Sequence, residues 1–225
     1  MSTRRSPRDV IPKAVAQALP TGRYWFVIGG QAVRCFAPYR PSNDVDFGVV
    51  TARNLIQLLG HLKKHGKAQV LERDEGTVHL RFNGVDVSIF VLRELEPYVV
   101  DNALDVTGVL ATKTHALLDR GLRRDFFDLY VMLELHSLGL ADCLRALREV
   151  YRTEVNDGLV LRALCYFEDA ETSPELPGEG KDDWSNVKEF FRRAVAALIV
   201  PPTKPLAIQA QVVDSEMPKP RRQRS

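Results

Sequence analysis

The sequence predicts a mixed α/β fold, in which an N-terminal β-sheet core is followed by a C-terminal helical lobe. Two observations carry this prediction. Residues 24–28, 44–50 and 77–90 show the apolar runs and the strict alternation that are typical of β-strands. From about Val106 onward, apolar residues recur instead at the spacing of amphipathic helices. We therefore expect the sheet in the first half of the chain and helices in the second.

The strands of the core are bounded by recognisable turn and cap residues. Tyr24 to Ile28 is an apolar run that ends at Gly29-Gly30, which predicts a buried strand, a tight turn and a helix that begins near Gln31. The alternation over 44–50 predicts a half-buried strand with one acidic face. Thr51 is a suitable N-cap for a helix that Gly66 ends.

A β-hairpin is predicted where Asn83-Gly84 separates two alternating runs. Both residues tolerate the positive φ angles of a type I′ turn. The two-residue loop sets a register that pairs Phe82 with Val85 and Arg81 with Asp86. One face of this hairpin is then apolar, and the other carries polar side chains.

Composition places the chain among ordinary globular proteins. Hydrophobic residues make up 45% and charged residues 27% of the 225 residues, which excludes a wholly disordered or collagen-like chain. The formal net charge is only +2, so any polyanion must be held by a local patch. No apolar run approaches the roughly 20 residues that span a bilayer, and no export signal is apparent. We expect a cytoplasmic protein with no membrane partner.

The chain divides into four segments. Residues 1–12 are basic and lack periodicity, so we expect a disordered N-terminus. Residues 13–105 form the predicted α/β core, and residues 106–200 form the predicted helical lobe. Residues 201–225 are polar, basic and proline-containing, and we expect a disordered tail.

Three carboxylates fall on polar faces of the predicted sheet. Asp44 and Asp46 share one face of a strand, and Asp86 lies on the polar face of the neighbouring hairpin. Three acids brought together repel one another unless a cation lies between them, and Mg²⁺ suits such oxygen ligands, with Mn²⁺ as the alternative. Two such ions about 4 Å apart can stabilise an in-line displacement at phosphorus. The Gly29-Gly30 turn offers backbone N–H groups to phosphate oxygens.

These residues resemble a known family. Gly29-Gly30, then Asp44-Val45-Asp46, then Asp86 are similar to the nucleotidyltransferase signature of the polymerase beta superfamily. Residues 113–120 (KTHALLDR) and 124–130 (RDFFDLY) are similar to the third and fourth motifs of the AbiEii/AbiGii abortive-infection toxin family, which includes the MenT toxins. The resemblance implies a polymerase-beta-type nucleotidyltransferase core with a mixed sheet, and it covers roughly residues 24–135.

The resemblance assigns roles to the residues of the core. Asp44 and Asp46 would hold the metal ions and the nucleoside triphosphate. Asp86 would bind the catalytic metal and help to activate the attacking hydroxyl. Gly29 and Gly30 would hold the β- and γ-phosphates.

The resemblance also assigns roles to charged residues outside these strands. Lys113 and Arg120 lie seven residues apart on one predicted helix, and both would neutralise the triphosphate. Asp125 corresponds to the acid of the fourth motif, which is needed for activity. Arg40 matches a basic position before the paired acids and would reach the phosphates. Gln31 departs from the pattern, because many relatives have a phosphate-contacting serine there.

The implied function is the metal-dependent transfer of a nucleoside monophosphate from an NTP to an acceptor. In relatives the acceptor can be the 3′ end of a tRNA, so we expect an RNA acceptor and a toxin with a cognate antitoxin. Alternatives stay open: a small-molecule or protein acceptor, or a degenerate module that only binds a nucleotide or a partner, which the departure at Gln31 supports. A two-metal nuclease also fits the three acids, but it leaves Lys113 and the glycine turn without a role.

Several of these residues also have ordinary structural interpretations. Asp86 could merely pair with Arg81 across the hairpin. Arg124 and Asp128 are four residues apart and could form an ion pair on one helix. The histidines share no metal-binding spacing, so we expect surface or core positions and no zinc for His61, His65, His79, His115 and His136.

Overall fold

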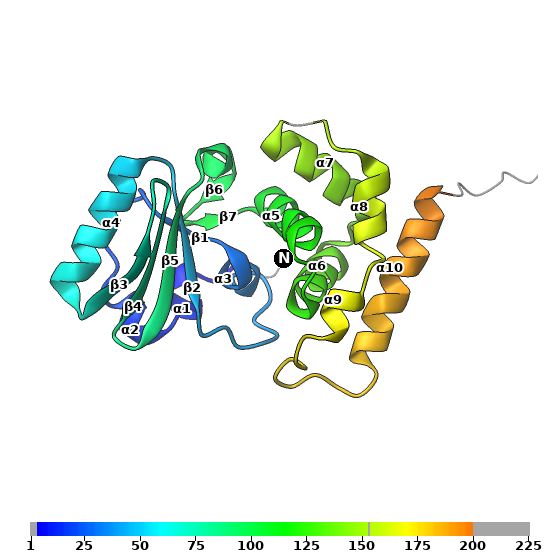
Figure 1. Ribbon diagram of the computed structural model, residues 1–225, viewed down its shortest axis with the longest axis horizontal. Helices are drawn as coiled ribbons and strands as arrows, with labels where there is room; N and C mark the ends of the chain where they lie inside the picture. The colour runs from blue at the N-terminus through cyan, green and yellow to red at the C-terminus, as the bar shows by residue number, and fades with distance from the viewer. Residues whose placement is uncertain (1–3, 153, 200–225) are drawn as a thin grey trace, which may run out of the picture.

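The computed structural model describes residues 4–152 and 154–199. Figure 1 shows a β-sheet lobe beside a helical lobe, with α3 and α5 where the two lobes meet. The sheet lobe contains, in chain order, α1 (Pro7–Val10), α2 (Lys13–Ala16), β1 (Phe26–Val27), α3 (Gly29–Arg34), β2 (Val45–Val49), α4 (Ala52–His65), β3 (Ala68–Arg73), β4 (Thr77–Phe82), β5 (Val85–Val91), the 3₁₀ helix η1 (Arg93–Tyr98), β6 (Val99–Val100) and β7 (Ala103–Leu104). The helical lobe contains α5 (Val106–Asp119), α6 (Arg123–His136), α7 (Leu140–Tyr151), α8 (Asp157–Ala163), α9 (Glu168–Glu171) and α10 (Asp183–Ile199).

The seven strands form one mixed sheet in the order β3-β4-β5-β2-β1-β7-β6. The β2 strand pairs parallel with β5 and antiparallel with β1, so it lies in the middle of the sheet. The hairpin register predicted from Asn83-Gly84 is confirmed, since Phe82 pairs with Val85 and Arg81 with Asp86. The predicted mixed α/β fold is therefore correct.

One face of the sheet is apolar and packs against α4. The hairpin side chains that point to this face are buried: Val78, Leu80, Phe82, Val87 and Ile89. They belong to the same hydrophobic cluster as the buried leucines of α4, which are Leu55, Leu58, Leu59 and Leu62. Thr51 caps α4 as predicted, because its hydroxyl accepts from the backbone N–H of Asn54. The polar face is left on the other side of the sheet.

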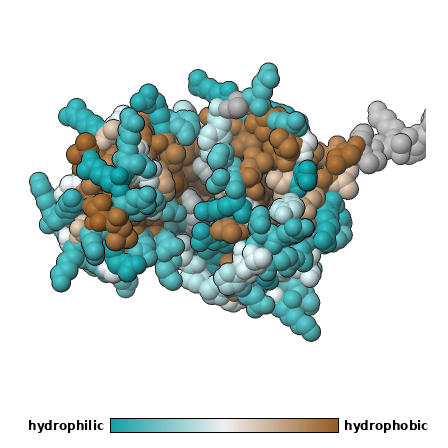
Figure 2. Space-filling model, in the orientation of Figure 1, coloured by the Kyte–Doolittle hydropathy of each residue, from teal (hydrophilic) through white to brown (hydrophobic). Residues whose placement is uncertain are grey.

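The helical lobe has its own hydrophobic cluster, centred on aromatic side chains. Phe126 of α6 packs against Phe167, Trp184 and Phe191, with ring centroids between 5.1 and 5.8 Å apart. Figure 2 shows hydrophilic residues over much of the visible surface and an apolar patch over the upper part of this lobe. Within the two described ranges, no helix combines the length and apolarity needed to cross a membrane.

The predicted disorder of residues 1–12 is wrong for the described part of that segment. Residues 7–10 form α1, and Val10 and Ile11 are buried. Arginines order the segment because they find backbone acceptors: Arg4 donates to the carbonyl of Leu104, and Arg8 donates to three carbonyls, those of Ala16, Leu19 and Pro20. The predicted tail at 201–225 lies outside the described residues.

Candidate active site

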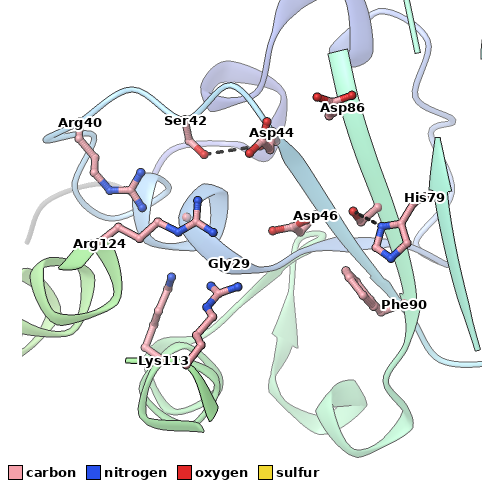
Figure 3. Close-up of a pocket in the computed structure, with 13 residues that line it drawn as sticks. Gly29, Arg40, Ser42, Asp44, Asp46, His79, Asp86, Phe90, Lys113 and Arg124 are labelled. Carbon is pink, nitrogen blue, oxygen red and sulfur yellow. Dashed lines mark hydrogen bonds between the residues drawn. The ribbon is translucent and has the colours of Figure 1, made fainter. Parts of the chain in front are cut away.

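A cavity of about 350 Å³ lies between the polar face of the sheet and the helical lobe. Figure 3 shows acids of β2 in its centre, and Arg40, Arg124 and Lys113 on one side of them. Most of the site residues expected from the sequence line this cavity: Gly29, Gly30, Arg40, Asp44, Asp46, Asp86, Lys113 and Arg120. Gln31 and Asp125 are the two that do not.

The glycine pair lies so close to charged side chains that larger residues do not fit. Gly29 has a φ of +61°, which L-residues with a side chain rarely adopt. A Cβ atom there would lie 2.8 Å from Oδ2 of Asp46. A Cβ atom on Gly30 would lie 3.0 Å from Nη2 of Arg40 and 3.2 Å from Oγ of Ser42. The turn therefore keeps open the space next to the β2 acids.

Asp46 is a half-buried carboxylate on the polar face of the sheet. Its side chain forms no ion pair or hydrogen bond with any residue of the described ranges. Burial raises its pKa, and the neighbouring Asp44 raises it further, against the lowering effect of Lys113 and the nearby arginines. Asp44 is exposed at the start of the same strand. Unpartnered acids of this kind are what a bound cation stabilises.

Asp86 does not join these two acids. Arg81 holds it from the opposite strand, with Nε 2.9 Å from Oδ1 and Nη2 3.1 Å from Oδ2. The two side chains are 54% and 50% exposed, so this is a solvated surface pair. Among the described residues, no three His, Cys, Asp or Glu side chains are placed to hold a metal ion together. The expected three-acid cluster is therefore wrong for this structure, and the pairing of Asp86 with Arg81 is confirmed.

Two acids of α6 lie behind the cavity and bind its cations. Asp125 accepts from Nζ of Lys113 at 3.3 Å and from Nε of Arg120 at 2.9 Å. Asp128 lies 2.6 Å from the same Nζ and accepts from Nη2 of Arg40 at 2.8 Å. Both carboxylates are fully buried. Asp125 therefore contacts the cations rather than the cavity itself.

The pKa of Asp128 lies below its usual value. Burial alone would raise it, but the charges of Lys113 and Arg40 and their hydrogen bonds outweigh burial. The hydroxyl of Tyr39 also donates to Asp128, at 2.5 Å. The expected pairing of Arg124 with Asp128 is wrong, because Asp128 already has these partners. Arg124 is exposed, lines the cavity and forms no ion pair within the described ranges.

Gln31 connects α3 to the segment that enters β2. Its side chain is buried, and Nε2 donates to the backbone carbonyls of Ser42 at 2.9 Å and Asp44 at 3.0 Å. The resemblance implied a phosphate contact for the residue at this position. In the structure, the Gln31 side chain instead faces the protein interior.

Sequence reasoning missed a set of cavity residues on the hairpin. His79 lies on β4, and Ser88 and Phe90 lie on β5, and all line the cavity. The alternation of the hairpin sequence puts His79 and Ser88 on its polar face, and this is the signal that could have indicated them. Their proximity to Asp46 depends on the pairing of β2 with β5, which the sequence did not indicate.

Comparisons with known proteins give a matching family model, a relative by sequence and a similar fold. The family model for the nucleotidyl transferase AbiEii toxin of type IV toxin–antitoxin systems matches residues 14–204. The uncharacterized protein aq_aa25 of Aquifex aeolicus is 24% identical over 201 residues, which cover 85% of this chain and 95% of that protein. The crystal structure of a nucleotidyltransferase candidate from H. pylori superimposes with a TM-score of 0.55 and 16% identity, covering 83% of this chain and 92% of the other.

Proposed function

The chain belongs to the AbiEii family of nucleotidyl transferase toxins, and from this membership we propose that it transfers a nucleoside monophosphate from an NTP to the 3′ end of an RNA such as a tRNA. One observation carries the proposal. The cavity holds a glycine turn and two acids at β2, Asp44 and Asp46, that form no ion pair within the described residues, and cations from the helical lobe face them. Such a site matches a metal-bound triphosphate, which needs both kinds of charge.

The acids of β2 fit a divalent metal ion. Within the described part of the chain, the side chains of Asp44 and Asp46 form no ion pair, so their oxygens are open to a ligand, and Gly29 leaves room beside Asp46. Mg²⁺ is commonly bound by a few carboxylates together with substrate phosphates. The bound ion would neutralise charge on the reacting phosphate. Asp86 would contribute a further oxygen only after it releases Arg81.

The cations fit the triphosphate. Arg120 and Arg124 are exposed at the cavity, and Lys113 and Arg40 lie deeper. Positive charge here stabilises the negative charge that develops on departing pyrophosphate. Asp125 is then a positioning residue, because it holds Lys113 and Arg120 in place without lining the cavity.

An RNA acceptor and a protein partner complete the proposal. The family description places the relatives in type IV toxin–antitoxin systems, so a cognate antitoxin encoded beside this chain is the proposed partner. Because the net charge of the chain is only +2, the protein as a whole attracts RNA weakly, and the acceptor would be bound by local contacts.

The proposal is tested by incubating the purified protein with each α-³²P-labelled NTP, Mg²⁺ or Mn²⁺, and total cellular RNA. We expect label in RNA from the wild type and a loss of about 1,000-fold in Asp46→Asn, since loss of metal binding removes several kcal/mol of stabilisation. Asp182→Asn is the matched control, because Asp182 is exposed directly before α10 and does not line the cavity.

Other outcomes separate the alternatives. Label that appears in protein or in a small product, with none in RNA, contradicts the RNA acceptor. Binding of NTP without any transfer indicates a binding module. Equal transfer by Asp46→Asn and the wild type contradicts the proposed metal site.

A further inference from the structure

One wall of the cavity has no role in the proposed function so far. It is formed by His79, Ser88 and Phe90 on the polar face of β4 and β5. We infer that this wall binds the acceptor and that His79 accepts the proton of the attacking hydroxyl. The inference rests on the proposed nucleotidyl transfer.

The positions of the charges decide on which side the acceptor lies. Arg40, Lys113, Arg120 and Arg124 all come from the loop before β2 or from the helical lobe. Figure 3 shows Asp46 between the labelled cations of this set and the pair His79 and Phe90. The β- and γ-phosphates belong with the cations. Because in-line displacement places the nucleophile opposite the leaving group, the acceptor hydroxyl approaches from the side of His79.

Strand register places His79 in one row with Asp46. Asp46 pairs with Ser88 across β2 and β5, and Ser88 pairs with His79 across β5 and β4. Two strand spacings of about 4.8 Å separate the backbones of Asp46 and His79, so the part of the cavity above Ser88 lies between the two side chains. In the row that contains Asp86, the residue on β4 is Arg81. Arg81 binds the Asp86 carboxylate, so this row offers no free proton acceptor comparable to His79.

The imidazole of His79 is oriented by its neighbours. Nδ1 lies 2.9 Å from Oγ of Ser88, and the ring meets Phe90 edge to face at a centroid distance of 5.7 Å. When Nδ1–H donates to Ser88, Nε2 keeps its lone pair for a proton. The charged groups near the ring are Glu72, its register partner on β3, the Arg81–Asp86 pair, and Asp46 on β2.

The proposed step is balanced within the cavity. The acceptor oxygen forms a bond to the α-phosphorus, and its proton passes to Nε2 of His79. The bond between the α-phosphorus and the bridging oxygen breaks, and pyrophosphate leaves toward the cations. The proton then returns to solvent.

Phe90 provides a surface for the acceptor. It is half-buried on the polar face and belongs to neither hydrophobic cluster of the described residues. Its ring therefore offers a face on which the base of an acceptor nucleotide can stack, which is sequence-tolerant and worth about 1–3 kcal/mol per base.

The test compares His79→Gly with the wild type in the total-RNA labelling assay. General-base catalysis contributes about 100-fold to 10,000-fold, so we expect kcat to fall at least about 100-fold. Added imidazole should restore a large part of it, which a purely structural role would not allow. His65→Gly is the control, since His65 is exposed on α4, which packs on the opposite face of the sheet.

Two further measurements keep the inference falsifiable. The affinity for a non-hydrolysable NTP with Mg²⁺ should stay within about twofold of wild type in His79→Gly, and thermal unfolding reports whether this variant is folded. Should it not fold, His79→Asn takes its place, with the same expected loss of kcat. Phe90→Leu should raise KM for RNA about tenfold, which corresponds to about 1.4 kcal/mol, without changing NTP affinity.

The failures are distinguishable. If the wild type transfers label and folded His79→Gly is as active, the inference is overturned while the proposed function stands. Loss of NTP affinity in His79→Gly also overturns it, because His79 then belongs to the nucleotide side. If the wild type transfers no label, both the function and the inference fall.

Discussion

Asp46 of β2 and the two acids of α6 lie near the same cations but differ in their partners. Asp46 is half-buried and has no side-chain partner within the described ranges. Asp125 and Asp128 are fully buried, and each is bound by two cations. The α6 acids thus hold the cations in place, and the β2 acid is left for a ligand. The α6 acids therefore have a structural role, and Asp46 is available to contact a ligand in the cavity.

This comparison can be tested through the free energy of unfolding of single-residue variants. The largest loss is expected for Asp128→Asn, which removes the buried carboxylate shared by Arg40 and Lys113 and leaves Lys113 with Asp125 alone. Breaking a buried pair in this way costs about 3–5 kcal/mol. Urea unfolding at neutral pH measures it, with Asp182→Asn as the control. A loss below about 1 kcal/mol would show that α6 does not depend on this network.

Gly29→Ala should cost about 1–2 kcal/mol, because the left-handed φ of +61° disfavours a side chain. The new Cβ would also displace Oδ2 of Asp46, so nucleotidyl transfer should fall as well. Gly60→Ala is the matched control. Gly60 lies within α4, and a Cβ atom added there would meet no neighbouring segment within 4 Å, so this exchange should instead stabilise by up to about 1 kcal/mol.

Asp86→Asn should change stability by no more than about 1 kcal/mol, because exposed ion pairs contribute little. A double-mutant cycle with Arg81→Ala measures the coupling between the two residues. The coupling should shrink in high salt, which screens exposed charges. Coupling of several kcal/mol would indicate that Asp86 is more constrained than its exposure implies.

The smallest effect on stability is expected for Asp46→Asn, in a chelator-treated sample. Burial raises the pKa of Asp46, so its ionised form disfavours the folded state at neutral pH. The variant should be at least as stable as the wild type at pH 7. The difference in the free energy of unfolding between the variant and the wild type should shrink as the pH falls toward 4. In that range the wild-type carboxyl is protonated in the folded state at a higher pH than in the unfolded state, which removes its unfavourable charge. Lower stability of the variant at pH 7 would reveal a structural partner.

The sequence predicted the parts of the fold that depend on local chemistry. The hairpin followed from Asn83-Gly84, which adopts φ angles of 48° and 85°, and α4 followed from the Thr51 cap. The β3 strand was not predicted, because its residues are almost all exposed at the sheet edge and lack an apolar alternation. The short helices α8 and α9 likewise have few buried residues to produce a periodic pattern.

The candidate site was predictable where a motif names its residues and unpredictable where distant segments meet. The bonds of Arg40 to Asp128 join residues 88 positions apart, and nothing local indicates them. His79 was assigned to surface or core, because only the strand order shows that β5 lies between it and Asp46. The disorder expected near Arg4 and Arg8 failed for a similar reason, since their acceptors are backbone carbonyls that a sequence pattern does not display.

The side-chain amide of Gln31 links α3, which follows the glycine turn, to the segment that enters β2. A single side chain holds the carbonyls of Ser42 and Asp44, immediately before Asp46. A serine, the residue that the family resemblance implies at this position, is too short to make both bonds. Gln31→Ser would therefore remove both hydrogen bonds and leave the entrance of β2 held only by its backbone and its neighbouring strands.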